Sequence, residues 1–294
     1  MDWESLVPHS LEFGGDPTLA SMYVVTYTKA LPYTGFFVLA WGTFDLLLRL
    51  LGFGHEIRSC RRGTWALKLM MLTHHGVITP LALLSMWQDP VIRQLYMCFG
   101  CDESARLMNR APFPPLAARA LTPVTIGYFV ADLLLLSQWQ LTKGSRTEQR
   151  LMLVHHIASM VVWPAAVYFD WVARYVIIML SYESTSLLLT LLWLISAAGY
   201  KQSLAYGLTG LLFTFLFIWL RMVGALPQLV AMARAPPWSQ QLLTEAQPDG
   251  IHSLAWLWCQ SLVLPHVMNL FWGVKVIQGA WATLTATSSK TKEK

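Results

Sequence analysis

The sequence predicts an all-α membrane protein built as a bundle of seven transmembrane helices. Its 294 residues are 55% hydrophobic and only 13% charged, whereas about a quarter of the residues of a typical soluble domain are charged. The 14 tryptophans and 10 tyrosines agree with this class, because their rings favour membrane–water interfaces. The net charge of +5 is modest and indicates basic cytosolic loops, not a nucleic-acid partner.

Seven apolar runs predict the seven helices. A helix needs about 20 apolar residues to cross the hydrocarbon layer. The runs cover residues 31–53, 65–87, 121–141, 151–171, 173–199, 204–232 and 251–281. The last three exceed the required length, which predicts helices that tilt or bend. Kinks are expected where prolines interrupt the runs, at Pro80, Pro164, Pro227 and Pro265.

The longest connection between two runs covers residues 89–120. Its middle, VIRQLYMCFGCDESARLM, predicts a short interfacial helix, and the proline-rich RAPFPPL is expected to end it because proline lacks an N–H and fixes φ. Cys98 and Cys101 form a lone CxxC here. A structural zinc site needs about four ligands, so we expect two unlinked thiols or a small disulfide.

The positions of the basic residues predict the orientation. The short segments of one side carry ten of them: Arg58, Arg61, Arg62, Lys143, Arg146, Arg150, Lys201, Lys290, Lys292 and Lys294. Because short basic loops stay in the cytosol, the N-terminus is predicted to be lumenal and the C-terminus cytosolic. The first 20 residues contain no lysine or arginine, so the first apolar run is expected to act as the insertion signal.

The C-terminal tail suggests a signal for subcellular localisation. Lys290 and Lys292 are the fifth and third residues from the end, a spacing that resembles the dilysine signal for retrieval to the endoplasmic reticulum. The predicted cytosolic placement favours this interpretation and a coat-protein partner. The alternative is a solvated charged tail without a partner.

Ionisable side chains within the apolar runs are candidate site residues, because charges in a bilayer are costly and usually face the interior of a bundle. His155 and His156 lie one turn inside the fourth run. Other runs carry Asp132, Glu183, Arg221, His266 and Asn269. We expect these groups to share a polar interior, in which a carboxylate orients an imidazole for proton transfer. The alternative for the two histidines is hydrogen bonding between helices.

Other polar residues receive structural interpretations. His74 and His75 form a second dyad, interpreted as helix-contact residues with a weaker expectation that they line the same cavity. Asp45 and Arg49 share a helix face and are expected to pair. None of the eight histidines falls into the HxxxH, HxxxxH or HxxHH spacings of di-iron membrane enzymes. The sequence therefore predicts no metal site.

Five motifs on successive runs resemble the TLC domain family of translocon-associated proteins and ceramide synthases. They are GYFVADL, LVHHIASM, YESTS, LRMV and MNLFWGVKVIQGA. The resemblance implies membrane helices around a central lipid cavity, formed by residues 65–281. Residues 1–30 would then be a lumenal segment, 31–64 the first transmembrane helix and a cytosolic loop, and 282–294 the tail. It also implies that His155 and His156 belong to an acyl-transfer site.

The fifth run departs from the ceramide synthases, which carry several aspartates there. This chain has SYESTSLLL, in which Glu183 is the only acidic residue. The pattern is similar to the branch of the family that does not synthesise ceramide. Members of that branch are linked to membrane phospholipid composition, lipid sensing or cargo transport out of the endoplasmic reticulum.

Two functions follow as hypotheses. In the first, the protein acts in lipid metabolism as an acyltransferase on a membrane lipid, with acyl-CoA or a phospholipid as acyl donor and no other cofactor. His155 or His156 acts as base or acyl acceptor, Glu183 or Asp132 orients it, and Arg221, Asn269 and His266 bind lipid. In the second, it is a non-catalytic lipid-binding regulator or cargo receptor. A seven-helix receptor or retinal protein is disfavoured, because Lys275 lies near the cytosolic end and can snorkel. The oligomeric state is not predicted.

Overall fold

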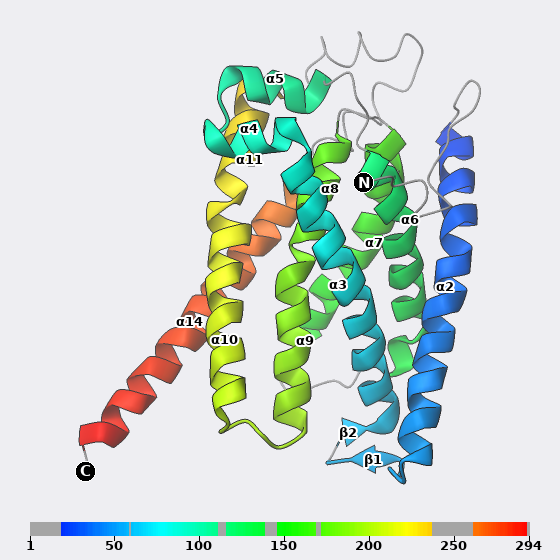
Figure 1. Cartoon of the computed structure of the whole chain (residues 1–294), viewed down its shortest axis with the longest axis vertical. Coiled ribbons are helices and arrows are strands. Elements are labelled where there is room, and N and C mark those ends of the chain that lie inside the picture. Colours follow the sequence, from blue (N-terminus) through cyan, green and yellow to red (C-terminus); the bar gives the residue numbers. More distant parts are fainter. Residues whose placement is uncertain are drawn as a thin grey trace.

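Helices form almost all of the described structure, a computed structural model that defines residues 19–58, 60–110, 116–138, 146–168, 172–236 and 261–292 (Figure 1). The long helices are α2 (Leu19–Leu50), α3 (Arg62–Gln88), α6 (Leu116–Leu134), α7 (Arg146–Tyr168) and α14 (Leu264–Lys292). The shorter ones are α4 (Pro90–Met97), α5 (Asp102–Arg110), α8 (Ala173–Ser181), α9 (Glu183–Ala197), α10 (Leu204–Leu216) and α11 (Ala225–Arg234). A 3₁₀ turn, η1 (Leu136–Gln138), follows α6, and a π-helical segment, η2 (Phe217–Val223), joins α10 to α11. A two-stranded hairpin of β1 (Glu56–Ile57) and β2 (Cys60–Arg61) connects α2 to α3.

The described helices confirm an all-α membrane protein. Five helical segments are long and apolar enough to span a bilayer: Met22–Leu50, Arg62–Gln88, Ala117–Leu134, Ala173–Ala197 and Leu204–Arg234. Large apolar side chains project outward from the outer helices, for example Leu39 of α2 and Leu211 of α10, which are 71% and 69% exposed. Such side chains are costly in water but suit a hydrocarbon surround.

The first helix begins at Leu19, well before the expected Leu31. Its early turns contact α7, where the hydroxyls of Tyr23 and Tyr27 donate hydrogen bonds to the carbonyls of Val161 and Met160 at 2.7 and 2.9 Å. The helix also packs closely on α6. A Cβ at Gly127 would lie 2.6 Å from the Tyr33 side chain and 2.7 Å from the Ala30 carbonyl. Contacts with other helices therefore extend α2 beyond its apolar run.

The fifth predicted run is two helices, because α8 and α9 separate at Tyr182. The sixth likewise contains the π-helical segment η2 between α10 and α11. The connection after α3 also forms two helices where one was expected: α4 and α5 meet at a Cys98–Cys101 disulfide. The RAPFPPL motif falls mainly outside the described residues, as does the start of the seventh run.

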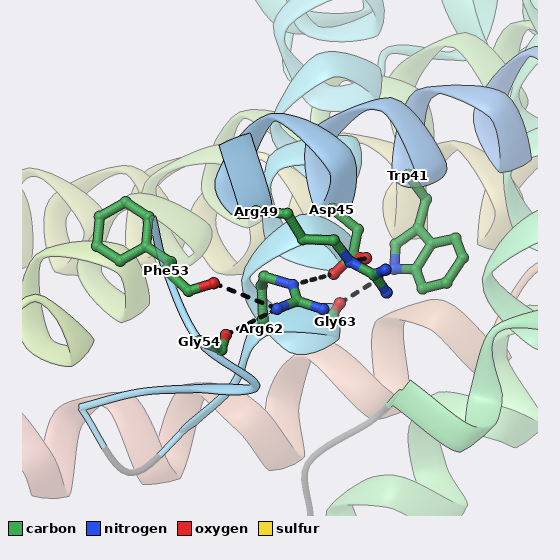
Figure 2. Close-up of polar contacts among 7 residues, drawn as sticks. All are labelled: Trp41, Asp45, Arg49, Phe53, Gly54, Arg62 and Gly63. Carbon is green, nitrogen blue, oxygen red and sulfur yellow. Dashed lines mark hydrogen bonds and ion pairs between the residues drawn. The ribbon is translucent and has the colours of Figure 1, made fainter. Parts of the chain in front are cut away.

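An ionic cluster fixes the end of α2 to the start of α3 (Figure 2). Both oxygens of the Asp45 carboxylate accept bonds, one from Nε of Arg49 at 3.0 Å and the other from Nε of Arg62 at 2.8 Å. Arg62 also donates to the carbonyls of Phe53 and Gly54. The expected Asp45–Arg49 pair is therefore part of a larger group that closes the hairpin connection.

Asp89 is predicted to be a stability determinant. Its Oδ1 caps α4 by accepting from the Val91 and Ile92 amides, and its Oδ2 accepts from Nε of Arg174 at 2.9 Å. The side chains of Arg174 and Asp89 are only 4% and 11% exposed. Asp89→Ala is expected to lower the free energy of unfolding by about 3–5 kcal/mol, because it leaves a buried guanidinium without its carboxylate. Thermal unfolding in detergent measures this.

Asp102 gives the matched control for that experiment. It pairs with Arg234 at 3.3 Å, but the two side chains are 75% and 50% exposed. Asp102→Ala is expected to change stability by about 0–1 kcal/mol, since water screens exposed pairs. Equal destabilisation by the two substitutions would contradict the role given to Asp89.

Candidate active site

A pocket of about 600 Å³ lies between the helices. This volume is in the usual range for small-molecule sites. Polar groups and aromatic rings line it together: Lys68, His75, Tyr128, Phe129, His155, His156, Ser159, Trp163, Tyr182, Glu183, Ser186, Trp193, Tyr206, Arg221, Asn269 and Trp272. The pocket thus receives side chains from α3, α6, α7, α8, α9, α10, η2, α14 and the α8–α9 junction.

Most of the residues predicted for a site meet at this pocket. His155, His156, Glu183, Arg221 and Asn269 all line it. Two others do not. Asp132 is fully buried behind His156, and His266 is buried in α14 away from the pocket lining.

His156 is held between a carboxylate and an aromatic ring. Its Nδ1 lies 3.3 Å from Oδ2 of Asp132, within ion-pair range, and its ring stacks on Phe129 with 4.5 Å between centroids. A carboxylate on the Nδ1 side favours the proton on that nitrogen and makes Nε2 the basic atom of the ring. His155 lies beside it, with its ring 6.3 Å from that of Trp272.

Glu183 contacts the second histidine dyad. Its Oε2 lies 2.9 Å from Nδ1 of His75, and Nδ1 of His75 lies 3.3 Å from Nδ1 of His74. The His74 ring stacks on Tyr128, with centroids 3.9 Å apart. Of the two carboxylates expected to orient His155 or His156, Asp132 is therefore the one beside that dyad, and Glu183 belongs to the His74–His75 side.

Arg221 brings a positive charge to the pocket from the π-helical segment η2, and its side chain is partly buried. Its guanidinium donates to three neutral acceptors: Oδ1 of Asn269 at 3.1 Å, the carbonyl of Tyr182 at 2.8 Å and Oγ of Ser186 at 3.3 Å. Its Nε is buried and has no hydrogen-bond partner among the residues that the structure defines. Within the described part of the chain, no carboxylate lies in ion-pair range of it. Glu183 interacts electrostatically with this guanidinium without contacting it, and a cation that touches only neutral acceptors in such a site favours an anionic ligand.

Gly224 terminates the π-helical segment. Its amide donates to the Trp219 carbonyl, five residues earlier, at 2.7 Å. A Cβ at this position would lie 2.7 Å from the Leu220 carbonyl. The glycine therefore permits the wide turn, and π-helical turns occur mostly at functional positions.

Lys68 is a site residue that the sequence did not single out, and His75 lines the pocket in agreement with the weaker expectation for the second dyad. Lys68 lines the pocket, with its Nζ 5.8 Å from the centroid of the Trp193 ring. The sequence contained a signal for Lys68, because Lys68, Met71 and His75 follow the i, i+3, i+7 spacing of one helix face. All three residues line the pocket.

The arrangement can bind an anionic group at Arg221 while presenting imidazoles to it across a largely aromatic cavity. Comparisons with known proteins bear on the same part of the chain. A family model described as the TLC domain matches residues 64–278, a stretch that contains every residue lining the pocket. Comparison with curated proteins gives no match.

Proposed function

Because this chain belongs to the TLC domain family, we propose that it acts in lipid metabolism and transfers an acyl chain to a membrane lipid bound in the pocket. The observation that carries this proposal is the placement of His155 and His156 on the pocket wall, with Asp132 3.3 Å from Nδ1 of His156. A buried carboxylate behind an imidazole is the usual arrangement of a general base.

His156 is the proposed base. Its Nε2 accepts the proton of a hydroxyl or amine on the acceptor lipid, while that oxygen or nitrogen attacks the acyl carbonyl of acyl-CoA or a phospholipid. The bond from the carbonyl carbon to the acceptor forms, the bond to the sulfur or oxygen of the donor breaks, and the leaving group takes the proton from His156. His155 offers a second imidazole on the same wall, and Arg221 and Asn269 bind the anionic part of the lipid.

A cavity lined by rings suits the acyl chain. Phe129, Trp163, Trp193 and Trp272 contribute apolar surface to the pocket, and burial of an acyl chain gains about 0.8 kcal/mol per CH₂. Exclusion of water from the pocket would protect an activated acyl group from hydrolysis.

The second candidate is a non-catalytic lipid-binding regulator or cargo receptor. The observation that favours it is Arg221, whose guanidinium contacts only neutral acceptors among the described residues and so suits retention of an anionic headgroup without any reaction. In that case the imidazoles would serve only as hydrogen-bonding groups.

Mass spectrometry of lipids that co-purify with the protein separates the two functions. Wild type is compared with the His155→Ala/His156→Ala double variant. A covalent acyl adduct or a turned-over lipid in wild type alone supports transfer. An intact lipid bound equally by both proteins supports the regulator.

The proposed topology has seven spans, with α7 and α14 added to the five apolar segments, a lumenal N-terminus and a cytosolic C-terminus. The Cys98–Cys101 disulfide supports it. This topology places the α4–α5 connection in the lumen, and disulfides form and persist in that oxidising compartment.

Lys290 and Lys292 are proposed to retain the protein in the endoplasmic reticulum through coat proteins. Helix α14 ends at Lys292, and the tail side chains lie outside the described residues. Lys290→Ala/Lys292→Ala is expected to move most of the protein to later compartments, as measured by imaging of a tagged chain. Lys294→Ala removes one positive charge from the same tail but lies outside the spacing, and should leave the location unchanged. Identical distributions of all three proteins would contradict the signal.

A further inference from the structure

The side chains of His74, His75 and Glu183 place three potential metal-ligand atoms close together at the wall of the pocket. We propose that this cluster is a binding site for a divalent transition metal of the zinc class, with His75 and Glu183 on the pocket wall and His74 behind them. This site is separate from the His155–His156 chemistry proposed above, and it departs from the absence of a metal site expected from the sequence.

The spacing of the three ligand atoms fits a small ion. Zinc with ligands at about 2.0–2.1 Å in a tetrahedron separates neighbouring ligand atoms by about 3.3 Å. Nδ1 of His74 and Nδ1 of His75 lie 3.3 Å apart, and Oε2 of Glu183 lies 2.9 Å from Nδ1 of His75. The flexible Glu183 side chain can adjust the shorter edge. All three ligand atoms lie within 4.8 Å of one another.

The hydrogen bonds around the three ligand atoms also favour a metal ion between them over a single shared proton. Nε2 of His74 lies 3.4 Å from Oγ1 of Thr125. If Nε2–H donates to that hydroxyl, Nδ1 of His74 turns a bare lone pair toward His75 and Glu183. One proton on Nδ1 of His75 then faces two acceptors and satisfies only one of them well. A metal ion would satisfy all three ligand atoms together.

The surroundings have the features of a metal shell. His74, His75 and Glu183 are 1%, 3% and 8% exposed. Thr125 holds the outer nitrogen of His74, as hydrogen-bonding groups behind metal ligands usually do. Two histidines and one glutamate leave the fourth position for a ligand on the pocket side, which is the pattern of catalytic rather than structural zinc.

Metal content tests the site directly. The full chain is purified in detergent through a tag without histidine, equilibrated with Zn²⁺, desalted and measured by elemental mass spectrometry. Wild type is expected to retain about one zinc ion per chain. His75→Asn and Glu183→Gln are each expected to retain at least about tenfold less, since even loss of an outer-shell partner costs about 10–100-fold.

Two further variants separate a metal site from general damage. Thr125→Val keeps the shape of that side chain and all three ligands, and should weaken zinc affinity by about 10–100-fold. His156→Asn removes another buried imidazole of the same pocket and should keep the full stoichiometry. With chelator present, the melting temperature of wild type should fall to that of Glu183→Gln, because metal affinity contributes to folding stability.

The expected pattern supports the site only as a whole. A wild-type chain that retains no zinc after equilibration overturns the proposal. Full retention by Glu183→Gln, or equal loss by His156→Asn, overturns it as well. Because acyl transfer is not measured, these results are independent of the proposed function.

Discussion

Replacing His156 with alanine is expected to reduce acyl transfer by about 10²–10⁴-fold, the usual contribution of a general base. The imidazole lies between Asp132 and the Phe129 ring on the pocket wall, so its removal leaves the bound lipid without a proton acceptor. Product formation is measured by mass spectrometry after reconstitution into vesicles with acyl-CoA or a phospholipid donor. Asp132→Asn should also slow transfer, because it removes the charge that stabilises the protonated ring.

A loss of activity is informative only if the variants fold. His156→Gln keeps a side chain that can hydrogen-bond, and its elution profile and melting temperature should match those of wild type. Asp102→Ala, which changes an exposed pair, should leave turnover unchanged. Undiminished turnover in both His155→Ala and His156→Ala would remove the basis for transfer at this dyad and leave the regulator as the function.

Arg221→Gln is expected to have the largest effect on lipid binding. The guanidinium is partly buried and contacts only neutral acceptors among the described side chains and carbonyls. Loss of a buried charged partner costs about 2–5 kcal/mol, or at least about 30-fold in affinity. The affinity for anionic and zwitterionic phospholipids is measured in nanodiscs. Arg221→Gln should lower the affinity for anionic phospholipids far more than the affinity for zwitterionic phospholipids.

Two arginine variants complete this experiment. Arg221→Lys keeps the charge but loses the planar fork that contacts Asn269 and the Tyr182 carbonyl together, so an intermediate loss is expected. Arg234→Gln removes a charge at a 50% exposed position and should not change lipid selectivity. If Arg221→Gln lowered the affinity for every lipid equally, the cause would be damage to the pocket and not the loss of a contact with an anion.

The fold class was predictable because it depends on the hydrophobic composition and on the length of the apolar runs. Both can be read directly from the sequence. The family match over residues 64–278 and the five apolar segments confirm the TLC resemblance and the membrane class. The limits of individual helices were less predictable. The start of α2 depends on tyrosines that bond to α7. The break between α8 and α9 falls at Tyr182, where the polar stretch SYESTS interrupts the fifth run.

The residues of the site were easier to predict than their partners. His155, His156, Glu183 and Arg221 stand out because charge is rare in apolar runs, and all four line the pocket. Which carboxylate faces which imidazole depends on how the helices rotate and stack. Adjacent residues differ by about 100° around a helix, so the choice of Asp132 or Glu183 for His156 needed the packing of α6 and α9.

The π-helical segment η2 sets the register between the two halves of the sixth span. A π turn accommodates one residue more than an α turn, which offsets the faces of α10 and α11 by about 100°. With this offset, α10 presents Leu211 and Phe215 outward, and Gln228 of α11 donates to the Tyr182 hydroxyl at 2.8 Å. Deletion of any one residue from Phe217–Val223 would reset this phase. Either Leu211 or Arg221 would then lose its present orientation, so the length of this segment is constrained as well as the arginine within it.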